Sequence, residues 1–144
     1  MEINRKYIGC FGKLKKFAHD PTAIVIHHTA TISPARTRET LKKKGYSTHF
    51  EVSPDGEIYQ YAEIWEQCSH VGSANSHCIG VDVTHMTGKS FPAAQIAAVR
   101  WLCVYLCTLA DIPQEVRRQL RGIYPHSALG CTSCPDGFPL EDLE

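Results

Sequence analysis

The stretch Ala23-Ile24-Val25-Ile26-His27 follows Pro21 and ends a run of apolar residues with a histidine. A short, β-branched run of this kind predicts a buried strand that presents His27 at its C-terminal end. Near the other end of the chain, His126 is followed by Cys134. Two imidazoles and one thiolate can fill three positions of a tetrahedral zinc site and leave the fourth for water. The sequence therefore predicts an open, catalytic type of metal centre.

The residues next to these ligands leave alternatives. Adjacent side chains of a strand face opposite ways, so only one of His27 and His28 can point at the metal. Cys131 and Cys134 form a C-x-x-C pattern, which alone would indicate a structural zinc site or a redox pair. No second C-x-x-C accompanies it, and Pro135 follows it instead of a helix.

Composition fits one soluble domain. The 144 residues are 43% hydrophobic and 21% charged, and 15 basic residues balance 15 acidic ones. A chain without net charge has no overall field that draws it to nucleic acid or to an anionic membrane. No apolar stretch approaches the ~20 residues of a membrane span, and residues 1–16 lack a signal-peptide pattern. We therefore expect a cytoplasmic protein.

Seven cysteines, an odd number, cannot all pair within one chain. Most are expected to be reduced thiols, as is usual in a cytosol. Cys103 and Cys107 occupy apolar positions of a predicted helix, whereas Cys68 and Cys78 bracket a loop and can form a bridge in an oxidising space.

The order of predicted elements alternates strands and helices. After the first strand we expect a helix over 36–44 that stops at Gly45, and an antiparallel hairpin of 48–52 with 57–61. An irregular loop over 62–77 then leads to a buried strand over 78–83, in which Gly80 allows close backbone approach. The remaining predicted elements are a long helix through 96–110, a short helical turn at 115–120 and a last strand at 123–124.

Five motifs in order resemble the zinc-dependent N-acetylmuramoyl-L-alanine amidases, a family that includes phage amidase-type lysozymes and peptidoglycan-recognition proteins. They are residues 24–31, residues 48–52 leading to Asp55-Gly56, His70-Val71-Gly72 with Asn75, residues 79–82, and His126 through Cys134-Pro135. The resemblance covers about residues 22–137. It implies a single α/β domain spanning 1–144, with a central mixed β-sheet of about five or six strands flanked by helices.

The resemblance also implies the ligands and the reaction. Zn²⁺ is held by His27, His126 and Cys134, and the amide between N-acetylmuramic acid and L-alanine is hydrolysed. Asp82 matches the position of a catalytic glutamate in cytosolic members and is the expected general base and acid. The alternative for Asp82 is a carboxylate that orients a ligand histidine.

Two further positions depart from the family. Thr48 stands where phage and animal members carry a tyrosine, and Tyr46 lies two residues earlier. Thr132 stands where many members carry a lysine that stabilises the oxyanion, and loss of such a donor can cost around two to three orders of magnitude in rate. The hydroxyl of Thr132, or the imidazole of His49 or His70, can partly compensate.

The loop around His70 and Asn75 resembles the substrate-facing loop of the family, and His49 is a further candidate for substrate binding. We expect a monomeric, bacteriolytic, endolysin-like enzyme that acts on peptidoglycan or muropeptides and reaches the cell wall from the host cytoplasm. Two alternatives remain. One is a peptidoglycan-binding module of the same fold without catalysis, and the other is a closed structural zinc site that uses Cys131 and Cys134.

Overall fold

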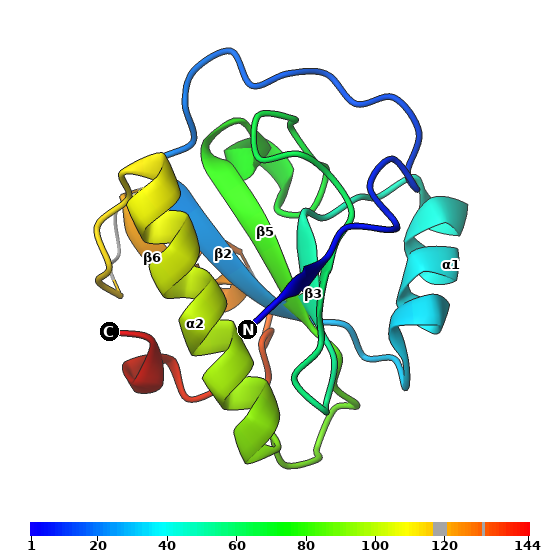
Figure 1. The fold of residues 1–144 in the computed structure, drawn as a ribbon, viewed down its shortest axis with the longest axis vertical. Helices are drawn as coiled ribbons and strands as arrows, with labels where there is room; N and C mark the ends of the chain where they lie inside the picture. The colour runs from blue at the N-terminus through cyan, green and yellow to red at the C-terminus, as the bar shows by residue number, and fades with distance from the viewer. Residues whose placement is uncertain (117–120, 131) are drawn as a thin grey trace.

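The computed structural model describes residues 1–116, 121–130 and 132–144. Within these ranges six strands form one mixed sheet in the order β1-β4-β3-β5-β2-β6 (Figure 1). Neighbouring strands are parallel except β3 and β4, which are antiparallel. The strands are β1 Ile3–Asn4, β2 Ala23–His28, β3 Phe50–Val52, β4 Ile58–Gln60, β5 Cys78–Val83 and β6 Gly122–Pro125. The predicted α/β class with a mixed, helix-flanked sheet is confirmed.

The helices of the described residues are α1 Pro34–Lys44 and α2 Ala93–Ala110, with short 3₁₀ helices η1 Gly72–His77, η2 His126–Ala128 and η3 Leu140–Leu143. Helix α2 covers one face of the sheet (Figure 1). Helix η3 lies beside α2, where Arg100 donates a hydrogen bond to the Asp142 carbonyl at 2.8 Å.

The alternation of side chains along β2 separates the two faces of the sheet. Ile24 and Ile26 point into the large apolar core beneath α2, whereas Ala23 and Val25 belong to a smaller cluster on the opposite face. Because side chains alternate with a period of two, His27 shares the face of Ala23 and Val25. The strand therefore places this histidine on the side of the sheet that α2 leaves uncovered.

Helix α2 corrects one expectation from the sequence. It has 18 residues and a mean hydropathy of 1.5, which by length and composition alone is enough for a membrane span. The expectation that no apolar stretch approaches such a length is therefore wrong. In the fold, Ala98, Leu102 and Leu106 of this helix are fully buried against the sheet, as in the core helix of a globular domain.

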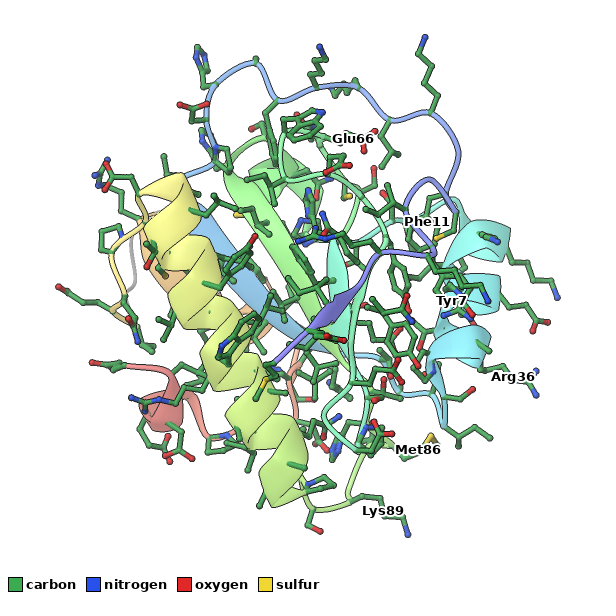
Figure 2. All side chains as sticks on the ribbon, viewed as in Figure 1. Tyr7, Phe11, Arg36, Glu66, Met86 and Lys89 are labelled. Carbon is green, nitrogen blue, oxygen red and sulfur yellow. The ribbon has the colours of Figure 1, made fainter. Side chains whose placement is uncertain are left out.

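Helix α1 begins two residues earlier than predicted, because Ser33 caps it and Pro34 occupies the first turn. It ends at Gly45, whose φ of 73° lies in the left-handed region that favours glycine. Arg38 of α1 lies 3.7 Å from the ring centre of Tyr7, so the N-terminal segment packs beside this helix (Figure 2). Arg36 points away from the molecule (Figure 2).

The other predicted strands agree with the structure to within two residues, and the predicted long helix begins three residues earlier than expected, at Ala93. Strand β1 and the short helices η1, η2 and η3 were not predicted, and η1 falls in the expected irregular loop. The expected helical turn at 115–120 lies, from residue 117 onward, outside the described residues. Cys68 and Cys78 are buried free thiols, so the structure does not contain the bridge considered for them.

Candidate metal centre

Parallel pairing brings the predicted ligands to one end of the sheet. Strand β2 lies between β5 and β6, and Ile26 is paired with Pro125. His27 follows Ile26 near the end of β2, and His126 follows Pro125 directly after β6. The carboxyl ends of neighbouring parallel strands are a common place for a site in α/β folds.

Cys134 completes the cluster from the C-terminal segment. The Nδ1 atoms of His27 and His126 lie 3.2 Å apart, and Cys134 Sγ lies 3.9 Å from His27 Nδ1. One nitrogen or sulfur atom from each residue lies within 4.8 Å of the other two. The backbone N–H of His28 also donates a hydrogen bond to Cys134 Sγ at 3.1 Å. The structure therefore brings together the three ligands predicted from the sequence.

The chemistry of this donor set fits a soft or borderline divalent cation. Burial, together with neighbouring His70 and His126, holds the pKa of His27 well below its usual value of 6.5. Its imidazole is therefore neutral at physiological pH and can offer a lone pair to a metal. Burial also raises the pKa of the Cys134 thiol to about 11, so a bound cation would be needed to favour its thiolate. Catalytic zinc sites use three protein ligands and keep a fourth position for water, and this cluster supplies three donors of the kinds that zinc binds.

His28 and Cys131 are the alternative ligands that the sequence left open, and the cluster among the described residues does not include His28. His28 points away from the cluster, with Nε2 3.0 Å from the Thr87 hydroxyl and its ring 5.7 Å from that of His85. His27 and His28 therefore point to opposite sides of the strand, as the sequence predicts. Cys131, the other thiol considered as a ligand, lies outside the described residues.

Hydrogen bonds of Asp136 connect the segment that carries Cys134 to the loop after β5. The Asp136 carboxylate accepts hydrogen bonds from the His85 ring at 2.9 Å and from the Gly88 backbone N–H at 2.8 Å. The His85 ring in turn stacks on Phe91, with ring centres 3.8 Å apart. These contacts restrict the path of the chain two residues beyond Cys134.

Asp82 lies beside the metal cluster on the next strand. It is paired with His27 across β2 and β5, and only 6% of it is exposed. The Thr48 hydroxyl donates a hydrogen bond to its carboxylate at 3.0 Å. Burial, followed by the nearby charge of Glu51, raises the pKa of Asp82 to about 8. This carboxyl group can therefore exchange a proton near neutral pH.

Glu51 is a residue of the site region to which the sequence analysis gave no role. It is paired with Asp82 across β3 and β5 and is fully buried. Its carboxylate accepts hydrogen bonds from the hydroxyls of Thr37, Tyr61 and Thr84 at 2.8, 2.6 and 2.6 Å. The sequence signal was a charged residue within a strand of the predicted hairpin, but its three partners come from separate segments.

Thr48 and Thr132, the two departures from the family, line the same cleft as the metal cluster. Thr132 lines this cleft, and its hydroxyl accepts a hydrogen bond from the Cys134 backbone N–H at 3.1 Å. Tyr46 also lines the cleft and is 54% exposed, but it precedes β3 instead of lying within a regular strand.

The three predicted substrate-binding residues differ in their placement. His70 and Asn75 line the cleft, and the Asn75 side chain accepts hydrogen bonds from the backbone N–H groups of His70 and Val71 at 3.0 and 2.7 Å. His49 is fully buried, with Nε2 2.6 Å from the Glu66 carbonyl and Nδ1 accepting the Gly80 N–H at 2.9 Å. This placement is inconsistent with contact between His49 and a substrate, because both ring nitrogens are occupied inside the protein.

The cleft has a volume of about 610 Å³ and an open mouth. His27, His126 and Cys134 line it together with Asp82. One wall comes from α1, including Thr37, Thr40, Leu41 and Lys44, and the other comes from the segment of residues 69–75. Several threonine and serine side chains are among the lining residues, so hydroxyl groups are available to hydrogen-bond a ligand.

Comparisons with known proteins agree with this geometry. A family model described as N-acetylmuramoyl-L-alanine amidase matches residues 17–137. The chain therefore belongs to the N-acetylmuramoyl-L-alanine amidase family. Among curated protein sequences, none matches this chain.

Several solved structures share the fold. The amidase LysC from Clostridium intestinale is 23% identical, with a TM-score of 0.82 and coverage of 99% of this chain and 95% of that one. A mutant endolysin from Bacillus subtilis is 25% identical, with a TM-score of 0.74 and coverage of 100% and 99%. Drosophila peptidoglycan recognition protein SA is 17% identical, with a TM-score of 0.71 and coverage of 99% and 90%.

Gly80 leaves no room for a side chain, because two polar side chains of the site lie directly over it. A Cβ atom at this position would lie 2.7 Å from Thr48 Oγ1 and 2.9 Å from His70 Nδ1. We expect Gly80→Ala to lower the free energy of unfolding by about 1–3 kcal/mol through overpacking, as measured by urea denaturation.

The matched control is Gly130→Ala, whose added Cβ would meet its nearest neighbour, His126 Nε2, at an ordinary 3.8 Å. Equal stability of the Gly80→Ala and Gly130→Ala variants would show that the close approach at Gly80 does not constrain the site.

Proposed function

We infer that this protein hydrolyses the amide bond between the lactyl group of N-acetylmuramic acid and L-alanine in peptidoglycan, and that it uses zinc. The observation that carries this inference is the convergence of His27, His126 and Cys134 in an open cleft of a chain that belongs to the amidase family. Amidase and endolysin structures of the same fold support this assignment.

His27, His126 and Cys134 would hold the zinc ion in this proposal, and they line a cleft that substrate and water can enter. Zinc bound there supplies a Lewis acid for the scissile carbonyl and lowers the pKa of water to about 7. The His28 backbone N–H, which donates to Cys134 Sγ, helps to stabilise the thiolate.

Asp82 is the proposed general base and acid. It takes a proton from the attacking water and returns it to the leaving amine. Burial raises the pKa of this carboxyl group toward neutral pH, and a catalytic group works best when its pKa is close to the working pH. Thr48 keeps one carboxylate oxygen of Asp82 in place through its hydroxyl, so we assign it a supporting role in catalysis.

Thr132 is the proposed donor to the oxyanion that develops on the carbonyl. Its hydroxyl already accepts a hydrogen bond from Cys134 N–H, which leaves its proton free to face the cleft. A neutral hydroxyl stabilises negative charge less strongly than a lysine does, so this residue contributes less than the cation found in many family members.

Asn75 and the segment around it form one proposed wall for the peptidoglycan stem, and α1 forms the other. An open cleft bounded by two walls suits a polymer as well as a small muropeptide. The endolysin from Bacillus subtilis that shares the fold favours polymeric peptidoglycan as the substrate. A monomer that reaches the cell wall from the host cytoplasm stays a prediction from the sequence.

A second candidate function is a peptidoglycan-binding module without catalysis. The threonine in place of lysine at Thr132 favours it, and peptidoglycan recognition protein SA shares the fold. The retained cysteine ligand Cys134 favours the enzyme.

The test combines metal analysis with digestion of purified sacculi. We expect one zinc ion per chain and release of stem peptides without new reducing ends. Cys134→Ser should lose zinc and activity together, because it removes the thiolate ligand. Zinc with sugar binding but no peptide release would support the binding module, and full activity of Cys134→Ser would contradict the proposed site.

The role of Asp82 gives a separate prediction. Asp82→Asn keeps the shape of the side chain but cannot take up a proton, so we expect peptide release to fall by roughly 10²–10⁴-fold. Zinc affinity should stay within a few-fold, and Asp111→Asn on the exposed end of α2 should leave activity unchanged. Loss of zinc from Asp82→Asn would instead assign Asp82 to orienting a ligand, and near-normal turnover would remove it from the mechanism.

A further inference from the structure

We propose that His70 is a positioning residue for the metal ligand His27, and that it fixes the tautomer in which His27 Nδ1 is free to bind the metal. This goes beyond the substrate-binding role that the sequence indicates for His70. It rests on the metal site of the proposed function and not on the identity of the substrate.

The two ring nitrogens of His27 face different neighbours. Its Nδ1 faces the cluster, 3.2 Å from His126 Nδ1 and 3.9 Å from Cys134 Sγ. Its Nε2 points the other way and lies 2.9 Å from His70 Nδ1. A neutral imidazole that offers one nitrogen to a metal carries its proton on the other nitrogen. His27 Nε2 is therefore the donor, and His70 Nδ1 must accept.

The second observation fixes the proton on His70. Its Nε2 lies 3.2 Å from the backbone carbonyl of Cys78, which can only accept a hydrogen bond. His70 Nε2 therefore carries the proton, and its Nδ1 keeps the lone pair that His27 needs. The hydrogen bonds run in one direction, from His27 to His70 and on to the first residue of β5. A partner of this kind raises the basicity of a ligand histidine and holds its ring in orientation.

The third observation is that His70 is itself held from several sides. Asn75 accepts the backbone N–H of His70 at 3.0 Å, and the His49 ring packs edge-on with ring centres 5.9 Å apart. The missing side chain of Gly80 makes room for His70 Nδ1, which a Cβ would approach to 2.9 Å. The loop that carries His70 thus contacts the metal ligand His27 through the His70 side chain.

The test compares variants that differ at the accepting atom. His70→Asn keeps a polar side-chain atom near the place of Nδ1, whereas His70→Leu removes the acceptor. His77→Leu, at the exposed end of η1, is the matched control on the same segment. Zinc affinity is measured by competition with a chromophoric chelator, and thermal unfolding of the metal-free proteins checks that each variant is folded.

We expect His70→Leu to bind zinc about 10–100-fold more weakly, His70→Asn to recover most of this loss, and His77→Leu to match the unchanged protein. Unchanged zinc affinity of a folded His70→Leu variant, with a raised KM for peptidoglycan, would overturn the proposal and make His70 a substrate contact. Because zinc affinity is measured without substrate, a failure of the proposed hydrolysis does not affect this result.

A second readout does not depend on affinity. Long-range ¹H–¹⁵N spectra of the zinc-loaded protein identify the protonated nitrogen of each imidazole. The proposal requires the proton on Nε2 of both His27 and His70. A proton on His70 Nδ1 would contradict it, because that atom could then no longer accept from His27.

Discussion

The parallel pairing of β2 with β5 and β6 is the constraint on which the site depends. It places His27 beside Asp82 in the same row of the sheet and brings His126 to the same edge. A slip of one residue in β2 would turn His27 toward the core beneath α2 and remove it from the cleft. The fully buried Ile24 and Ile26 oppose such a slip, because it would expose them on the cleft side.

The same row shows how the fold accommodates buried polar groups. His27, Asp82 and Glu51 follow one another across β2, β5 and β3. Burial of such groups is unfavourable unless each has hydrogen-bond partners. Hydroxyl groups donate to both carboxylates here, from Thr48 to one oxygen of Asp82 and from three separate segments to Glu51. Neutral hydroxyl donors leave the negative charge of Glu51 close to Asp82, which contributes to the raised pKa of Asp82.

Much of the fold was predictable because the main strands and helices carry regular apolar patterns. Strand β5 has the predicted bounds, and β2 differs by a single residue. Strand β1, with two residues, and η1, without apolar periodicity, are too weak as patterns to be recognised. The metal cluster was predictable because its residue types and their order resemble a known family.

The contacts around that cluster were less predictable. The carbonyl of Cys78 accepts from His70, yet a backbone acceptor leaves no mark in a sequence. His49 was a candidate for substrate binding, but its side chain and that of the adjacent Thr48 have different surroundings. Thr48 lines the cleft, whereas His49 is enclosed between Glu66 and Gly80. Such distinctions depend on which distant segments meet.

The central claim is an open metal centre with two nitrogen ligands and one sulfur ligand. X-ray absorption at the zinc edge of the loaded protein tests it most directly. The account predicts two nitrogen neighbours at about 2.0 Å, one sulfur at about 2.3 Å and one oxygen from water. A second sulfur in place of the oxygen would indicate a closed structural site and would contradict the account.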